Sequence, residues 1–153
     1  MPFSFNDLNT NLESILPELV VIAFALIIIF VDLFTKGREN KSGILAGISI
    51  IGYVIAGVIC VLYYNNIVGS PLLSNTPVYN TTAFAGMVTV DNLGLFFKLI
   101  SLLTAIITVL FSTQFVKERG FALGEYYGVL ALATVGMMVT SAAVDLTSIF
   151  VGI

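Results

Sequence analysis

Two of the ionisable residues that lie inside long apolar runs, Glu125 and Lys98, are of interest for chemistry. Glu125 follows Gly124 and precedes Tyr126 and Tyr127, at the start of an apolar run that reaches position 143. Lys98 lies in an earlier run, roughly 7 to 8 Å from the start of that run if the run is helical. A charge within a segment long enough to cross a bilayer is costly unless it is paired, neutralised or close to water. Glu125 and Lys98 are therefore the candidates for a proton path.

These charges also have structural interpretations. Lys98 can extend its four-carbon stem to the membrane interface, or it can pair with a carboxylate such as Glu18, and we favour such a structural role over a proton path. Glu18 follows Pro17 in the first turn of an expected helix, where the helix dipole favours negative charge, so we interpret it as an interfacial helix-start residue. Asp32, near the end of that helix, is expected to pair with Lys36.

The composition indicates a membrane protein and excludes several kinds of site. Hydrophobic residues make up 58% of the chain and charged residues only 10%, and the mean hydropathy is +1.06. A soluble domain typically has about 25% charged residues. There is no histidine, and Cys60 is the single cysteine, so an internal disulfide and a cysteine-built zinc or iron–sulfur site are excluded.

We also expect no catalytic residue, metal or cofactor on this chain. It has no phosphate-binding glycine loop and no pattern that pairs a nucleophile with a base. The net charge of −3 and the isoelectric point near 4.6 argue against a nucleic-acid partner.

Apolar runs divide the chain into the elements that position these residues. Runs at 15–34, 43–64, 93–115 and 121–143 are each long enough to cross a bilayer. A fifth run, 146–153, follows a turn at Asp145 and covers only about 12 Å of a hydrocarbon core of about 30 Å. The sequence therefore predicts an all-α polytopic membrane protein, with four transmembrane helices and the start of a fifth in one membrane domain, 1–153.

Shorter signals complete this outline. Asp91 or Asn92 is expected to cap the third helix. Alternating residues at 81–90 predict a short hairpin at the membrane surface. Gly124 belongs to a series of glycines at spacing four, with Gly120 and Gly128, so that helix face is expected to pack closely against a neighbour.

Charge sets the expected orientation. Five of the six basic residues lie in two connecting segments, 35–42 and 116–121, and the other connections have none. By the positive-inside rule these two segments face the cytoplasm and the N-terminus lies outside. The N-terminal segment carries acids rather than a basic region, so we do not interpret it as a cleaved signal peptide.

Several short motifs, taken in order, resemble one known family. The order and the spacing of these motifs carry the resemblance, which covers nearly the whole chain. The motifs are Leu16-Pro17-Glu18-Leu19, Asp32-Leu33-Phe34, Phe84-Ala85-Gly86, Asp91-Asn92, Gly124-Glu125-Tyr126-Tyr127, Gly136-Met137-Met138, Ser141-Ala142, Asp145-Leu146 and Ile149-Phe150-Val151-Gly152-Ile153. In these motifs the chain resembles the N-terminal part of subunit N of the proton-pumping NADH-quinone oxidoreductases, the respiratory complex I family.

The resemblance implies an antiporter-like subunit of the membrane arm, which couples quinone reduction elsewhere in the complex to proton translocation. It implies partner subunits that bind the quinone and NADH or another donor, such as reduced ferredoxin or a deazaflavin. It also implies an energy-converting membrane, most simply a prokaryotic plasma membrane. The family's pumping glutamate and its paired lysine would lie beyond Ile153, so we expect a longer subunit that continues with glutamate. The alternative is a subunit of a multisubunit cation/proton antiporter without a redox partner. Those relatives usually have a Thr-Gly-Asp and an Asn-Leu-Phe in the region where this chain has Ser141-Ala142-Ala143-Val144-Asp145-Leu146, and this departure favours subunit N.

Overall fold

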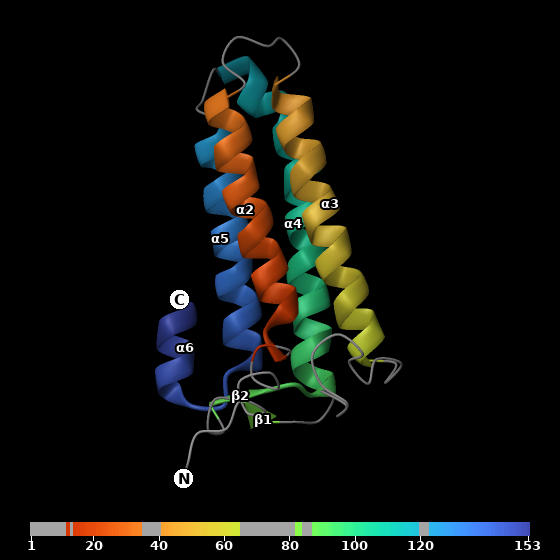
Figure 1. The fold of residues 1–153 in the computed structure, drawn as a ribbon, viewed down its shortest axis with the longest axis vertical. Coiled ribbons are helices and arrows are strands. Elements are labelled where there is room, and N and C mark those ends of the chain that lie inside the picture. The colour runs from red at the N-terminus through yellow and green to blue at the C-terminus, as the bar shows by residue number, and fades with distance from the viewer. Residues whose placement is uncertain (1–11, 13, 35–40, 65–81, 84–86, 120–122) are drawn as a thin grey trace.

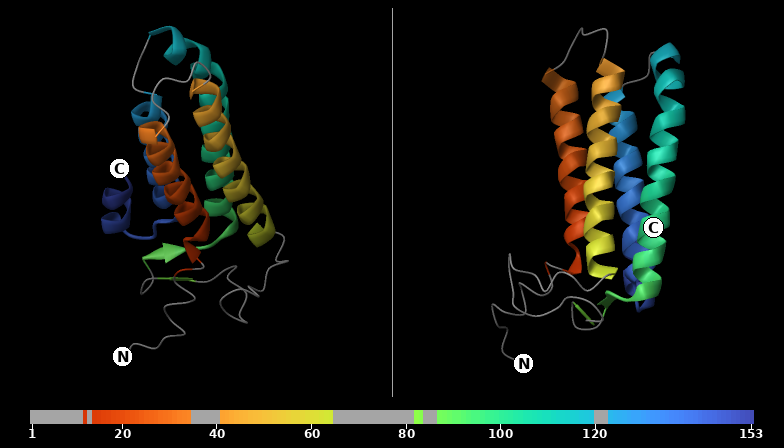
Figure 2. Two further views of the ribbon diagram at one scale, coloured as in Figure 1. Left: turned by 45° about the horizontal axis from the view of Figure 1, so that its top comes forward. Right: turned by 90° about the vertical axis from the view of Figure 1, so that its right-hand side faces the viewer.

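Four long helices form an antiparallel bundle in the computed structural model, which describes residues 12, 14–34, 41–64, 82–83, 87–119 and 123–153. The helices are α2 (Leu16–Phe34), α3 (Lys41–Tyr64), α4 (Asn92–Arg119) and α5 (Leu123–Ala142). The chain runs up and down through them in order (Figure 1). A short helix, α6 (Leu146–Gly152), lies outside the bundle beside α5 (Figure 2).

The helices occupy the corners of the bundle in chain order. α2 packs on α3 and α5, and α4 packs on the same two helices. The direct packing between α2 and α4 is slight in comparison, so these two helices stand at opposite corners. Any side-chain contact between α2 and α4 must therefore cross the interior of the bundle.

Three of these helices are long and apolar enough to cross a membrane, namely 16–34, 42–63 and 92–116. α5 runs alongside them but opens with the more polar Gly124, Glu125 and the tyrosine pair. An all-α polytopic membrane fold is therefore confirmed, while the count of four spans stays a prediction.

The predicted helix boundaries are mostly right, with one correction. α4 continues through Arg119, although residues 116–121 were expected to form a basic loop. The reason is local, because lysine and arginine are good helix formers and the first helix-ending residue, a glycine, comes only at position 120. A helix C-terminus also favours positive charge.

A two-stranded hairpin closes one end of the bundle, which we name the hairpin end; the opposite end is the far end. Strands β1 (Thr82–Ala83) and β2 (Val88–Thr89) pair antiparallel, which confirms the hairpin predicted from alternation. A bridge between Val88 and Ala143, and a hydrogen bond from the Val144 amide to the Met87 carbonyl at 3.0 Å, tie the hairpin to the turn after α5. The starts of α2 and α4 are at this same end (Figure 1).

The bundle is apolar outside as well as inside. Large apolar side chains on the outer faces of the helices are exposed, which is the surface expected against lipid rather than water. They include Leu26, Phe30, Leu103, Leu110, Phe111, Val129 and Leu132. The interior is built of Val, Leu and many small residues, and it also contains buried polar side chains, notably Glu18, Ser49, Lys98 and Thr134.

Some glycines allow the close helix contacts that the sequence predicted. A side chain at Gly128 would touch Ile29, and one at Gly124 would overlap the Asp32 side chain, so both glycines face α2. Gly120, the third member of that series, lies outside the described residues. Gly52 likewise admits the Phe24 ring, since a Cβ there would lie 2.6 Å from the Phe24 Cγ atom.

Candidate functional site

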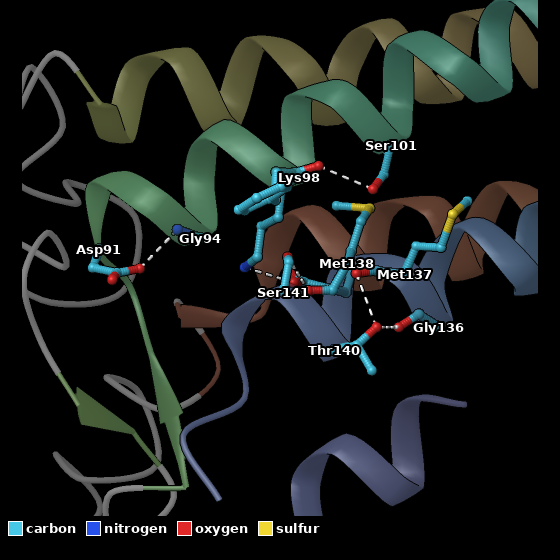
Figure 3. Close-up of polar contacts among 11 residues, drawn as sticks. Asp91, Gly94, Lys98, Ser101, Gly136, Met137, Met138, Thr140 and Ser141 are labelled. Carbon is cyan, nitrogen blue, oxygen red and sulfur yellow. Dashed lines mark hydrogen bonds and ion pairs between the residues drawn. The ribbon is translucent and has the colours of Figure 1, made fainter.

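The most unusual feature of the bundle is a buried ion pair across its diagonal. Lys98 Nζ on α4 lies 2.6 Å from Glu18 Oε1 on α2, and the dashed line from the Lys98 nitrogen in Figure 3 marks this contact. The two residues are only 1% and 3% exposed. Because α2 and α4 stand at opposite corners, this pair occupies the middle of the bundle, about one turn from the hairpin end.

Local structure explains why Lys98 points inward. The Asp91 carboxylate accepts the Gly94 amide at 2.9 Å, which confirms the predicted cap and fixes the start of α4 (Figure 3). Gly94 has no side chain, and a Cβ there would lie 3.1 Å from the Ser141 carbonyl oxygen, so α4 can approach the end of α5 closely. Lys98 follows one turn after Gly94 and therefore shares its face.

One oxygen of this ion pair lacks a partner. Glu18 Oε2 is buried and has no hydrogen-bond donor among the described residues. The other such atom is the hydroxyl oxygen of Tyr53, deeper in the bundle. A buried polar atom without a partner typically costs about 1–3 kcal/mol.

These contacts decide between the interpretations of the two residues. Lys98 pairs with Glu18, as one alternative predicted, and does not extend to the interface. Glu18 lies in the first turn of α2, as predicted, but its side chain is enclosed by the bundle and pairs with Lys98. The pair was predictable from one feature of the sequence. A lysine in an apolar helix needs a counter-charge, and the up-and-down order of the helices places Glu18 and Lys98 at the same end of the bundle.

Glu125 lies elsewhere, at the far end. α5 begins at Leu123, so Glu125 is in its first turn, where the helix dipole favours a carboxylate, and its side chain is exposed in this chain. We expect Glu125 to face protein or water rather than lipid in the assembled complex, and this stays a prediction. Glu125 and Lys98 are therefore not brought together.

The residues around Glu125 anchor the start of α5. The Gly124 amide donates to Asp32 Oδ1 at 3.0 Å, so α2 caps α5. The buried Tyr127 donates its hydroxyl to Thr113 Oγ1 on α4 at 3.4 Å, and the Tyr126 ring stacks edge-on against it at 5.3 Å. The motif thus links three helices. Lys36, the predicted partner of Asp32, lies outside the described residues.

Asp145 forms the predicted turn and caps α6. Its Oδ1 accepts the Ser148 amide at 2.8 Å. This hydrogen bond holds the pKa of the Asp145 carboxyl below its usual value. Over the described part of the chain, no group of three or more His, Cys, Asp or Glu residues is placed to hold a metal ion. The role of Asp145 is therefore that of a helix cap.

Comparison with known proteins extends the sequence resemblance. No family model matches the chain. It is 34% identical to NADH-quinone oxidoreductase subunit N of Trichlorobacter lovleyi, over 94% of this chain and 26% of the relative. It is 33% identical to the Chloroflexus aggregans subunit N, again over 94% of the chain and 26% of the relative. Against NAD(P)H-quinone oxidoreductase subunit 2 of Synechocystis, the identity is 30% over 100% of the chain and 27% of the relative.

These matches run through both ends of the bundle, because they cover nearly every residue of the chain. The chain spans about a quarter of the length of the curated relatives it matches. Its apolar helices agree with a membrane subunit. In sequence, the chain is similar over nearly its whole length to a part of NADH-quinone oxidoreductase subunit N.

Proposed function

We propose that this chain is part of a membrane-arm subunit that couples quinone reduction to proton translocation in an NADH-quinone oxidoreductase. The observation that carries the proposal is the match of the whole chain to subunits N and 2 of quinone oxidoreductases. The quinone is reduced on partner subunits, which also bind NADH or another donor, such as ferredoxin or a deazaflavin. This chain contributes membrane helices and ionisable groups, and no redox centre.

The ionisable groups within the bundle support a role in proton movement. Glu18 and Lys98 form a charged pair in the hairpin half, and Glu125 lies at the far end of α5. Intramembrane ionisable residues are costly, and they commonly mark ion or proton pathways. The alternative, a cation/proton antiporter subunit without a redox partner, is less well supported, because the relatives described above are quinone oxidoreductase subunits.

The proposal is tested with the intact complex. We expect the complex purified from native membranes through a tag on this subunit, and reconstituted in liposomes, to acidify one compartment while a donor reduces quinone. The donors are supplied one at a time. If removal of the gene leaves donor-driven quinone reduction and proton translocation unchanged, the proposal is wrong.

Orientation forms part of the same proposal. The split of basic residues between the connecting segments predicts an outside N-terminus in a prokaryotic plasma membrane. Cysteines introduced as Arg38→Cys and Asn75→Cys, in a Cys60→Ser background, test it with an impermeant thiol reagent on intact cells. We expect label at position 75 and none at position 38, and the opposite pattern contradicts the orientation.

A further inference from the structure

The ion pair inside the bundle, near the hairpin end, is not explained by stability alone. Replacing a buried ion pair with well-packed apolar residues is often neutral or stabilising, because desolvation of two ions offsets their attraction. Here the balance is less favourable still, since Glu18 Oε2 is buried without a donor. Glu18 is buried in the bundle, and its Oε2 atom has no hydrogen-bond donor among the described residues. This combination points to chemistry at Oε2.

Water is the ligand that suits Glu18 Oε2. Internal waters in proteins usually bind polar groups that would otherwise be unsatisfied. A second unsatisfied atom lies in the same interior, the buried hydroxyl oxygen of Tyr53. Tyr53 and Cys60 are on one helix, seven residues and thus about 10 Å apart. Unsatisfied polar atoms are therefore present at two depths of the bundle.

Few other titratable groups surround Glu18 in the described residues. Lys98 faces it from α4, and Cys60, which is fully buried on α3, interacts electrostatically with both charges. The titratable residues of α5 are in its first turns at the far end. On α2 itself the next is Asp32, near the opposite end of the helix. Lys98 is therefore the charged group that contacts Glu18 among the described residues.

We infer that Glu18 is a water-accessible proton-exchange residue in the hairpin half of the bundle, with Oε2 as the exchanging atom and Lys98 as its positioning residue. In the step, a hydronium ion gives a proton to Oε2. One O–H bond of the hydronium breaks, one O–H bond forms on the carboxyl group, and a water molecule remains. Release is the reverse, and no electron moves. The inference rests on the proposed function, which supplies the driving force for the proton.

Cys60 offers a direct test of water access, because it is the single cysteine of the chain, is buried, and is close enough to Lys98 and Glu18 to feel the charge of both. In the purified complex, the rate of deuterium exchange at its S–H group is followed by infrared spectroscopy, with the band assigned by Cys60→Ser. The matched control is Cys60→Ser/Ala46→Cys, a buried thiol on the same helix towards the far end. We expect Cys60 to exchange about tenfold faster or more than the control. Equal rates overturn the inference.

Proton transfer is tested in reconstituted complex with Glu18→Leu/Lys98→Met, which removes both charges and keeps similar volumes. We expect a lower ratio of protons translocated to quinone reduced, while Ser101→Ala, whose hydroxyl bonds only its own helix, keeps the ratio. An unchanged ratio in the double variant overturns the inference and leaves the proposed function standing. A wild-type complex that does not pump contradicts the proposed function instead.

A milder variant covers the case in which the double variant does not assemble. Glu18→Gln keeps the side-chain shape but removes the carboxyl group that is protonated in the proposed step. During turnover we expect the wild-type complex to show an infrared carbonyl band of a protonated carboxylic acid that is missing in Glu18→Gln. A wild-type spectrum identical to that of Glu18→Gln overturns the inference.

Discussion

Single and double replacements of Glu18 and Lys98 are expected to differ sharply in their effect on stability. At 2.6 Å, two unit charges attract by about 6 kcal/mol at an effective dielectric constant of about 20. Glu18→Leu or Lys98→Met alone loses this attraction and leaves one ion buried, and such losses typically reach about 3–5 kcal/mol. That range lies below the Coulomb value, because the remaining ion can become neutral or draw in water.

The double variant, Glu18→Leu/Lys98→Met, removes the charge and its desolvation cost together. Its free energy of unfolding is expected to lie near or above that of the wild type. The two single effects should therefore not add, and the coupling free energy should exceed about 3 kcal/mol. Interhelical hydrogen bonds in membranes couple by only about 0.6 kcal/mol on average, so this value separates a charged pair from an ordinary polar contact.

The wild type, the two single variants and the double variant are unfolded reversibly by SDS in mixed micelles. Unfolding is followed by the loss of the helical circular dichroism signal, because the described bundle is helical. A matched control is Ser101→Ala on α4, which should change the free energy by less than about 1 kcal/mol because its hydroxyl bonds only its own helix and is half-buried. If the single effects add within about 0.5 kcal/mol, the two side chains behave as independent sites, and the reasoning from the ion pair is wrong.

Three further predictions concern the helix ends. Gly124→Ala should destabilise the subunit by about 1–3 kcal/mol, since the added methyl would overlap Asp32. The control is Gly47→Ala, which has nothing within 4 Å of the new methyl and should be neutral or stabilising in the same SDS titration. Asp145→Ala should speed amide exchange in the first turn of α6. The lowered pKa means that this cap is present at neutral pH and is lost as the pH falls through that pKa, so acid should reproduce the variant's exchange pattern in the wild type. Glu125→Ala should lower proton translocation more than subunit abundance, and full pumping in the assembled variant would contradict a proton role for Glu125.

Composition and periodicity were enough to predict the helices and the hairpin, because both are local in origin. Helix starts and ends follow residues such as Asp91 and Asp145, whose caps involve an amide three residues away. The end of α4 was predicted too early, since basic residues were interpreted as loop rather than as a favourable last turn. Local patterns thus set element type well and element ends less well.

The candidate site was only partly predictable, because burial is decided by how helices pack. Glu18 and Glu125 look alike in sequence, each a carboxylate in the first turn of an apolar helix. The bundle encloses Glu18 because Lys98 reaches it across the diagonal, while Glu125 is exposed at the other end. That difference depends on which helices are diagonal neighbours, and single-sequence periodicity carries no such information.

The five carboxylates whose side chains the structure describes fall into two groups by what they bind. Asp32, Asp91 and Asp145 each accept a backbone amide near the start of a helix, and these bonds hold the ends of the bundle. A capped carboxylate is a poor proton carrier, because protonation would break the hydrogen bond that it accepts. Glu18 and Glu125 accept no backbone amide among the described residues: Glu18 contacts Lys98 with one oxygen and has no donor at the other, and Glu125 is exposed. Protonation of Glu18 or Glu125 would thus break no amide hydrogen bond of the kind that the aspartates accept. We therefore expect proton exchange in this chain at these two glutamates first.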